Sequence, residues 1–122
     1  MARILIVDDE PGILKMLKIN LEMEGHDVML AADGYTALRR IETESPDVVL
    51  LDIMMPVVDG WEVLRNLRSQ KLRYSPKVIV MTAKTGETDQ SKGISLGAEE
   101  YIRKPFDIEH LLSVIQEVME RV

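Results

Sequence analysis

Residues Val48 to Leu51 form an uninterrupted apolar run that ends on the carboxylate of Asp52. A run of this length, rich in valine and leucine, is typical of a strand buried on both faces, as in the interior of a parallel sheet. Such a strand requires helices on both faces of its sheet, which constrains the chain to an α/β fold. A carboxylate at the end of the strand can cap the following turn, or it can belong to a functional site.

The rest of the chain repeats the same alternation of short apolar runs and amphipathic segments. Helical spacing of large apolar residues follows most of the runs and is clearest between Ile108 and Met119. The segment from Lys84 to Gly97 has three glycines and few large apolar residues, so we expect a loop with a short, marginal helix. Five strands alternating with five helices predict a doubly wound parallel sheet. The other four strands are expected at Arg3 to Val7, Val28 to Ala31, Val78 to Met81 and Glu100 to Arg103.

Length and composition limit the classes of protein to consider. A chain of 122 residues is expected to form a single domain, 1–122. Its net charge of −6 argues against a nucleic-acid groove or a face that binds anionic membranes. It has no cysteine, which excludes disulfides and thiolate metal sites. No apolar run approaches the ~18 residues that span a bilayer, and the N-terminal run is too short for a signal peptide, so we expect a cytoplasmic location.

Polar residues follow several of the predicted strands at the point where each strand ends. Asp8 and Asp9 follow the first strand, Asp52 ends the third, Thr82 the fourth, and Lys104 the fifth. In open parallel sheets, functional groups gather beyond the carboxyl ends of the strands, where the strand order reverses. If the first and third strands are neighbours, three carboxylates share one pocket with one ammonium and one hydroxyl.

The electrostatics of such a pocket indicate what it binds. Two carboxylates about 4 Å apart repel by roughly 4 kcal/mol at an effective dielectric constant near 20. One ammonium offsets only part of the repulsion among three, so either a carboxyl takes up a proton or a divalent cation fills the gap. Oxygen ligands without histidine or cysteine favour Mg²⁺ or Mn²⁺. Together with a carboxylate nucleophile, best assigned to Asp52, this pattern favours phosphoryl transfer.

Each of these residues also has a simpler interpretation. The acidic run at residues 8–10 can be a helix start favoured by the helix dipole. Thr82 can be a turn cap, and Lys104 a solvated surface group. Coincidence of all of these at one end of one sheet is much less probable than any one alone.

Four motifs in this order and spacing resemble the receiver domain of two-component response regulators, and the resemblance spans essentially the whole chain. The motifs are Ile4 to Pro11, Leu50 to Pro56 with Asp59-Gly60, Val80 to Ala83, and Lys104-Pro105-Phe106. The resemblance implies a flavodoxin-like (βα)5 fold with strand order 2-1-3-4-5. It implies that the chain is a signalling switch and not an enzyme, although it catalyses its own phosphorylation and dephosphorylation.

The resemblance also implies a role for each site residue. Asp52 accepts a phosphoryl group from a histidine kinase, a phosphotransfer protein or a small acyl phosphate. Mg²⁺ is ligated by Asp9, Asp52 and the backbone carbonyl of Met54, with Asp8 acting mainly through a water molecule.

A second group of residues is implied to respond to the phosphate. Lys104 pairs with the phosphoryl group, Thr82 and Ala83 contact it, and Tyr101 swings inward behind Thr82. The peptide bond before Pro105 is expected to be cis. The signal is expected to leave through the face made by the helix of the 84–97 segment, the fifth strand and the last helix, toward an output protein or domain; homodimerisation through that face is possible.

Two other classes of protein share parts of this pattern: a phosphatase, and a binding module that is either receiver-like or flavin-binding. A phosphatase of the haloacid-dehalogenase type needs a second acid two residues after the nucleophile, where this chain has Met54. It also usually needs a cap domain, for which we expect no residues to remain. A receiver-like module that never carries phosphate is disfavoured by the intact acidic set. A flavin-binding protein of the same fold would need hydroxyl and glycine groups after the first strand, where the chain has residues 8–10, all acidic.

Overall fold

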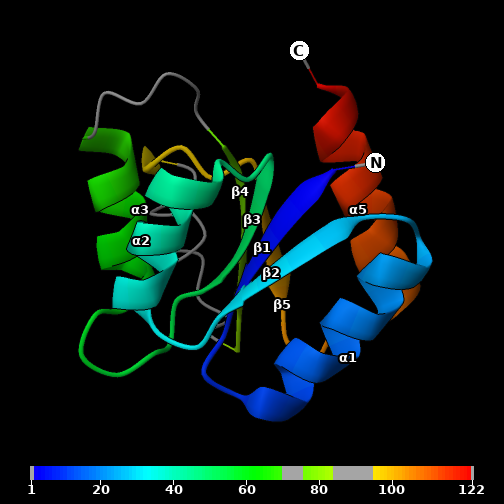
Figure 1. Cartoon of the computed structure of the whole chain (residues 1–122), viewed down its shortest axis with the longest axis horizontal. Helices are drawn as coiled ribbons and strands as arrows, with labels where there is room; N and C mark the ends of the chain where they lie inside the picture. The colour runs from blue at the N-terminus through cyan, green and yellow to red at the C-terminus, as the bar shows by residue number, and fades with distance from the viewer. Residues whose placement is uncertain (1, 70–75, 84–94, 122) are drawn as a thin grey trace.

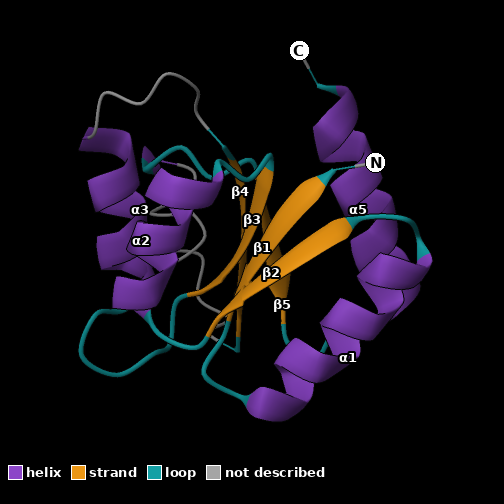
Figure 2. Cartoon of the chain, viewed as in Figure 1, coloured by secondary structure: helices purple, strands orange, loops and turns teal. Residues whose placement is uncertain are grey.

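The computed structural model describes residues 2–69, 76–83 and 95–121 of the chain. It has a five-stranded sheet with helices on both faces (Figures 1 and 2). Most of the segment 84–97, for which we expected a loop and a short helix, lies outside the described residues. The elements are β1 (Arg3–Val7), α1 (Pro11–Met23), β2 (Asp27–Ala31), α2 (Gly34–Glu44), β3 (Val48–Asp52), α3 (Gly60–Ser69), β4 (Lys77–Thr82), β5 (Glu100–Arg103) and α5 (Ile108–Glu120).

All strand pairs are parallel, and the strand order is β2-β1-β3-β4-β5, as predicted. The first strand of the chain therefore lies beside the third, with Val7 paired to Leu51. Strand order reverses between these two strands, because β2 lies on one side of β1 and β3 on the other. The carboxyl ends of all five strands meet at one edge of the sheet, at the bottom of Figure 1.

The strands divide their side chains between two apolar clusters, one under each helical layer. On β1, Ile4 and Ile6 face the cluster with α1 and α5, while Leu5 and Val7 face the cluster with α2 and α3. The residues of β3 and β4 alternate in the same way. This period of two explains why β3 reads as a continuous apolar run: both of its faces are buried, and Val49 and Leu50 are both 0% exposed.

Two strands begin one residue earlier than predicted. Asp27 starts β2 because its N–H donates to the carbonyl of Ala2, and Lys77 starts β4 because its N–H donates to the carbonyl of Asp47. Both residues are polar, so the apolar pattern cannot include them. Backbone pairing with a neighbouring strand extends each ladder without help from the side chain.

Side-chain and glycine caps mark several helix ends. The Asp33 carboxylate accepts a hydrogen bond from the N–H of Thr36, and that of Asp59 accepts one from the N–H of Glu62. Gly25 has φ 89° just after α1, as expected for a left-handed helix end. Within the described residues, no helix is long and apolar enough to cross a membrane.

Gly60, the first residue of α3, lies against the end of β3. A Cβ atom at this position would lie 2.4 Å from the Cα of Ile53 and 2.5 Å from the backbone oxygen of Asp52. Backbone atoms cannot give way as a flexible side chain can. The absence of a side chain at Gly60 therefore allows α3 to pack on the segment that carries Asp52.

We expect Gly60→Ala to lower the free energy of unfolding by about 1–3 kcal/mol, because the added methyl group overpacks this contact. Gly12→Ala in α1 is the matched control, since nothing lies within 4 Å of its Cβ position. That change should be neutral or raise the free energy of unfolding by up to about 1 kcal/mol. Urea unfolding of both variants measures the difference, and equal stabilities would contradict the close packing of α3.

Candidate functional site

Carboxylates from two neighbouring strands meet at the edge where strand order reverses. Asp8 directly follows β1, and Asp52 is the last residue of β3. Asp8, Asp9 and Asp52 each place one oxygen so that the three lie within 4.8 Å of one another. Asp8 and Asp52 are buried, whereas Asp9 is exposed. The structure therefore brings together the three acids that the sequence pattern selected.

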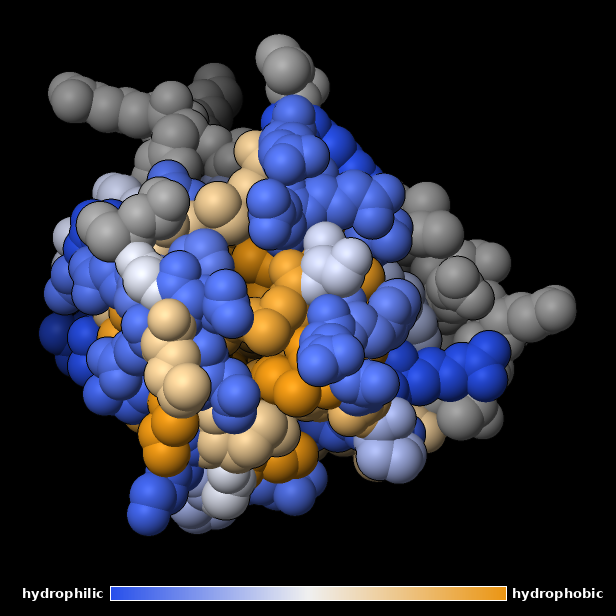
Figure 3. Space-filling model, turned by 90° about the vertical axis from the view of Figure 1, so that its right-hand side faces the viewer, coloured by the Kyte–Doolittle hydropathy of each residue, from blue (hydrophilic) through white to orange (hydrophobic). Residues whose placement is uncertain are grey.

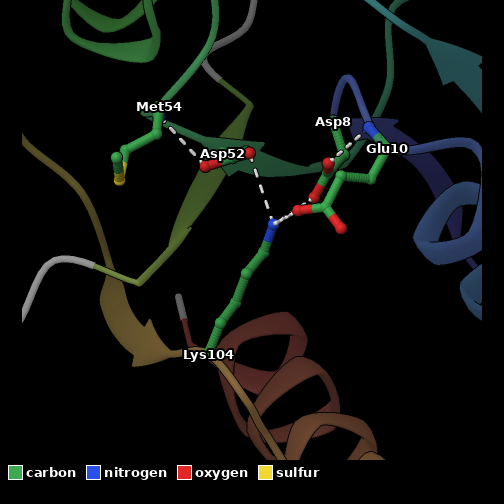
Figure 4. A network of polar contacts seen from close by, with 5 residues as sticks. All are labelled: Asp8, Glu10, Asp52, Met54 and Lys104. Atoms are coloured by element: carbon green, nitrogen blue, oxygen red, sulfur yellow. Dashed lines mark hydrogen bonds and ion pairs between the residues drawn. The ribbon is translucent and has the colours of Figure 1, made fainter.

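Lys104 supplies the positive charge among these acids. Its Nζ atom lies 2.5 Å from Oδ2 of Asp8 and 3.3 Å from Oδ2 of Asp52. Figure 4 shows the lysine reaching from the end of β5 across to the ends of β1 and β3. Its side chain is only 11% exposed, so the interpretation of Lys104 as a solvated surface group is wrong.

Each of the two buried carboxylates also binds backbone. Oδ1 of Asp8 accepts a hydrogen bond of 2.9 Å from the N–H of Glu10, and Oδ1 of Asp52 accepts one of 3.0 Å from the N–H of Met54. The turn-capping interpretation of Asp52 is therefore confirmed, and it is compatible with a place in the acidic cluster. One oxygen of each carboxylate orients the group, and the other faces the pocket.

Burial and neighbouring charges shift the acid–base properties of the site. Burial raises the pKa of Asp52 above the ordinary aspartate value; the bond to Met54 and the charge of Lys104 oppose this, and the charge of Asp8 adds to it. Burial alone would lower the pKa of Lys104. The hydrogen bond to Asp8 and the charges of Asp52 and Asp8 outweigh burial and raise it, so the lysine stays protonated.

The acid cluster has the chemistry and the spacing of a Mg²⁺ site. Oxygen ligands on opposite sides of one Mg²⁺ ion are about 4.2 Å apart. Three carboxylate oxygens within 4.8 Å of one another are close to this spacing. The donors are all oxygen, which favours Mg²⁺ or Mn²⁺ over softer metals.

The remaining predicted residues lie around the pocket in different ways. Thr82 is fully buried at the end of β4, paired in register with Arg103. Ala83 and the side chain of Met54 are exposed. The peptide bond between Lys104 and Pro105 is cis, as the resemblance implied.

Tyr101 lies away from the acids. It is half-buried on β5, where it pairs with Val80 and packs against the apolar cluster under α2 and α3. Thr82 follows the alternation of β4 toward the same face, since its neighbour Met81 faces the opposite cluster. Tyr101 thus lies on the same side of the sheet as Thr82.

Glu10 is the contact residue to which the sequence analysis gave no individual role. Its Oε1 atom lies 3.8 Å from Nζ of Lys104 at the mouth of the pocket (Figure 4). The acidic run was visible in the sequence, but the reach of Lys104 to its third member was not. One signal was available: glutamate directly before Pro11 is a poor residue for capping a helix.

Comparison with known proteins identifies relatives across the whole chain. The model of the response regulator receiver domain family matches residues 4–116. The chain is 43% identical over 119 residues to the alkaline phosphatase synthesis transcriptional regulatory protein PhoP of Bacillus subtilis. That alignment covers 98% of this chain and 49% of PhoP, so the chain spans about half the length of this curated relative.

Solved structures agree with this assignment. The receiver domain of the Francisella response regulator 1452 superposes with a TM-score of 0.92 at 32% identity, covering 99% of this chain and 98% of that one. The BeF3-activated N-terminal receiver domain of Klebsiella pneumoniae RstA gives 0.89 at 28% identity, covering 98% and 99%.

The haloacid-dehalogenase alternative finds no support, because Met54 occupies the position of the required second acid. The fold, the pocket of Asp8, Asp9 and Asp52, and the family match agree on a phosphorylation-activated signalling protein and not a catalytic enzyme. The chain belongs to the receiver domain family of two-component response regulators.

Proposed function

We propose that Asp52 is the phosphoacceptor of a Mg²⁺-dependent receiver domain that covers residues 1–122. One observation carries this proposal: Asp8 and Asp9 after β1 and Asp52 at the end of β3 each place one carboxylate oxygen within 4.8 Å of the others. An oxygen of Asp52 forms a bond to phosphorus while the P–N or P–O bond of the donor breaks, and the leaving group keeps the electron pair. The product is an aspartyl phosphate.

Asp9, Asp52 and the carbonyl of Met54 would hold the metal, with Asp8 in its outer shell. When bound, Mg²⁺ would offset the charge of the phosphoryl oxygens. Lys104 already lies 3.3 Å from Oδ2 of Asp52, so it needs only a small movement to pair with a phosphoryl group there. Asp8 keeps the lysine charged and directed inward through their 2.5 Å contact.

We further propose that Thr82, Ala83 and Tyr101 transmit the phosphorylated state. Thr82 lies at the end of β4, beside the end of β3 that carries Asp52. A shift of its hydroxyl toward the phosphate would vacate space on the side of the sheet where Tyr101 packs. The output face would include β5 and α5; its third predicted element lies within 84–97, mostly outside the described residues.

The partners we propose are a histidine kinase or phosphotransfer protein upstream, and an output protein or domain downstream, in the cytoplasm.

Asp52 is 3% exposed, so a donor must approach through the mouth of the pocket. Beside Lys104 the mouth opens into a hollow of about 340 Å³ lined by apolar groups of Ile13, Met16 and Phe106. Apolar side chains are also visible between hydrophilic ones on the α1 and α5 side of the molecule (Figure 3). The apolar lining of the hollow beside Lys104 suits contact with a protein donor.

Phosphorylation of Asp52 is directly testable. Incubation with acetyl phosphate or phosphoramidate and Mg²⁺ should add one phosphoryl group to the chain, detected by intact-mass analysis. The addition should be lost in Asp52→Asn and in EDTA, and retained in Glu42→Gln, an exposed control on α2. A phosphoryl group on the Asn variant, or none on the parent, would favour a receiver-like module that does not use Asp52.

Mg²⁺ should raise the melting temperature, because it binds the folded acid cluster and not the unfolded chain. At ten times the dissociation constant the gain is about 1.4 kcal/mol, or a few degrees in Tm. The shift should shrink in Asp9→Asn and remain in Glu42→Gln. Thermal melts in EDTA and in millimolar Mg²⁺ measure it, and an unchanged Tm of the parent would argue against the metal site.

Without metal, Asp52→Asn should be at least as stable as the parent near neutral pH. Asparagine can still accept the bond from Met54 while the crowded negative charge is removed. The pKa of Asp52 is raised in the folded protein. Just above the ordinary aspartate pKa, the folded parent therefore binds more protons than the unfolded chain. The free energy of unfolding of the parent consequently falls as pH rises through that range. The gain of the variant should therefore grow from acid to neutral pH. A loss of more than ~2 kcal/mol in urea unfolding would indicate a structural role for Asp52 instead.

A further inference from the structure

Glu10 occupies the N-cap position of α1 without using its side chain as a cap. Its backbone is extended, with φ −92° and ψ 112°, and the structure records no side-chain capping bond. The backbone of Glu10 is fully engaged instead. Its N–H donates to Asp8, and its carbonyl accepts from the N–H groups of Ile13 and Leu14. Helix capping therefore does not explain a glutamate here, since aspartate, asparagine or serine would serve better.

The Glu10 side chain extends toward the pocket mouth. Its Oε1 atom lies 3.8 Å from Nζ of Lys104, and the same nitrogen lies 3.3 Å from Oδ2 of Asp52. The Glu10 carboxylate is thus one ammonium away from the predicted phosphoacceptor (Figure 4). Glu10 is 62% exposed and Lys104 is 11% exposed, so the glutamate lies nearer to solvent than the lysine that it contacts.

We propose that Glu10 is a positioning and specificity-determining residue that holds Lys104 at the pocket mouth and disfavours small phosphodonors in proportion to their negative charge. This inference rests on the function proposed for Asp52. Glu10 does not react itself; it acts through Lys104 and through its own charge.

Two physical effects of Glu10 work in the same direction. An anionic donor that approaches Asp52 passes the Glu10 carboxylate, which only solvent screens. The energy of this repulsion grows in proportion to the charge of the donor. The phosphoryl group must also draw Lys104 away from the acids that hold it, and Glu10 is one of those acids. Glu10→Gln removes both effects and leaves a side chain of the same length.

The ratio of rates with two donors separates charge from structure. Acetyl phosphate is doubly charged near pH 7, and phosphoramidate is singly charged overall. For a carboxylate roughly 6–8 Å from the incoming donor, Coulomb's law in water gives an increase of about sixfold to tenfold with acetyl phosphate and about twofold to threefold with phosphoramidate when Glu10 becomes Gln. Release of Lys104 would multiply both rates by the same factor, so the effect of donor charge appears as a larger increase with the dianion than with the monoanion.

Initial rates of phosphorylation, from timed intact-mass measurements at low donor concentration, give the two ratios. Each variant is assayed at a Mg²⁺ concentration that saturates its own Tm shift, because a lost charge also weakens metal binding. Glu10→Asp keeps the charge and should keep the donor preference of the parent. Glu42→Gln loses one charge on the exposed face of α2 and should match the parent with both donors.

Salt provides the last readout. Near 1 M salt the Debye length falls to about 3 Å, so the difference between Glu10→Gln and the parent should nearly vanish. Unequal acceleration of the two donors that disappears in salt supports the proposal. Equal acceleration, no acceleration, or a difference that persists in salt overturns it. If the parent itself takes up no phosphoryl group from either donor, the function proposed for Asp52 fails first, which is a separate result.

Discussion

The site depends on one ammonium placed among carboxylates that the sheet forces together. Parallel pairing of β1 with β3 puts Asp8 and Asp52 at the same edge of the sheet. Lys104 directly follows β5, the outer strand of the sheet, and its ammonium contacts both carboxylates. Its position offsets part of a repulsion of several kcal/mol. The remaining excess of negative charge gives the pocket its affinity for cations.

The two buried acids are part of the turns as well as of the pocket. Asp8 binds the N–H of Glu10 and Asp52 binds that of Met54, so each carboxylate is held by the loop that follows its own strand. The orientation of the reactive oxygens is therefore set by local backbone geometry, and Gly60 keeps the second of these loops close to α3. A site built in this way is rigid on the carboxylate side and adjustable on the lysine side.

The sheet and its acidic edge could be predicted because both follow from short-range periodicity. Alternation along each strand and the rule for parallel sheets place Asp8, Asp52 and Lys104 at one edge. Contacts made by long side chains could not be predicted. Lys77 donates to the carbonyls of Val118 and Arg121 at the end of α5. Glu10 forms an ion pair with Lys104. The fold, and not the spacing along the sequence, determines which partners such long side chains can reach.

Charge balance connects the resting and phosphorylated states of this pocket. Three carboxylates and one ammonium leave a deficit of positive charge that a single divalent ion would balance. Under the proposed function, phosphorylation of Asp52 would form an acyl phosphate and would replace the carboxylate charge with the larger charge of a phosphoryl group at nearly the same place. The positive charge must then follow, and Lys104 is the residue that can move, since it is joined to the acids only through its flexible chain. The acids that hold Lys104 in the resting state, Asp8 and the exposed Glu10, therefore oppose the phosphorylated state, and the exposed one can be altered without disturbing the buried core.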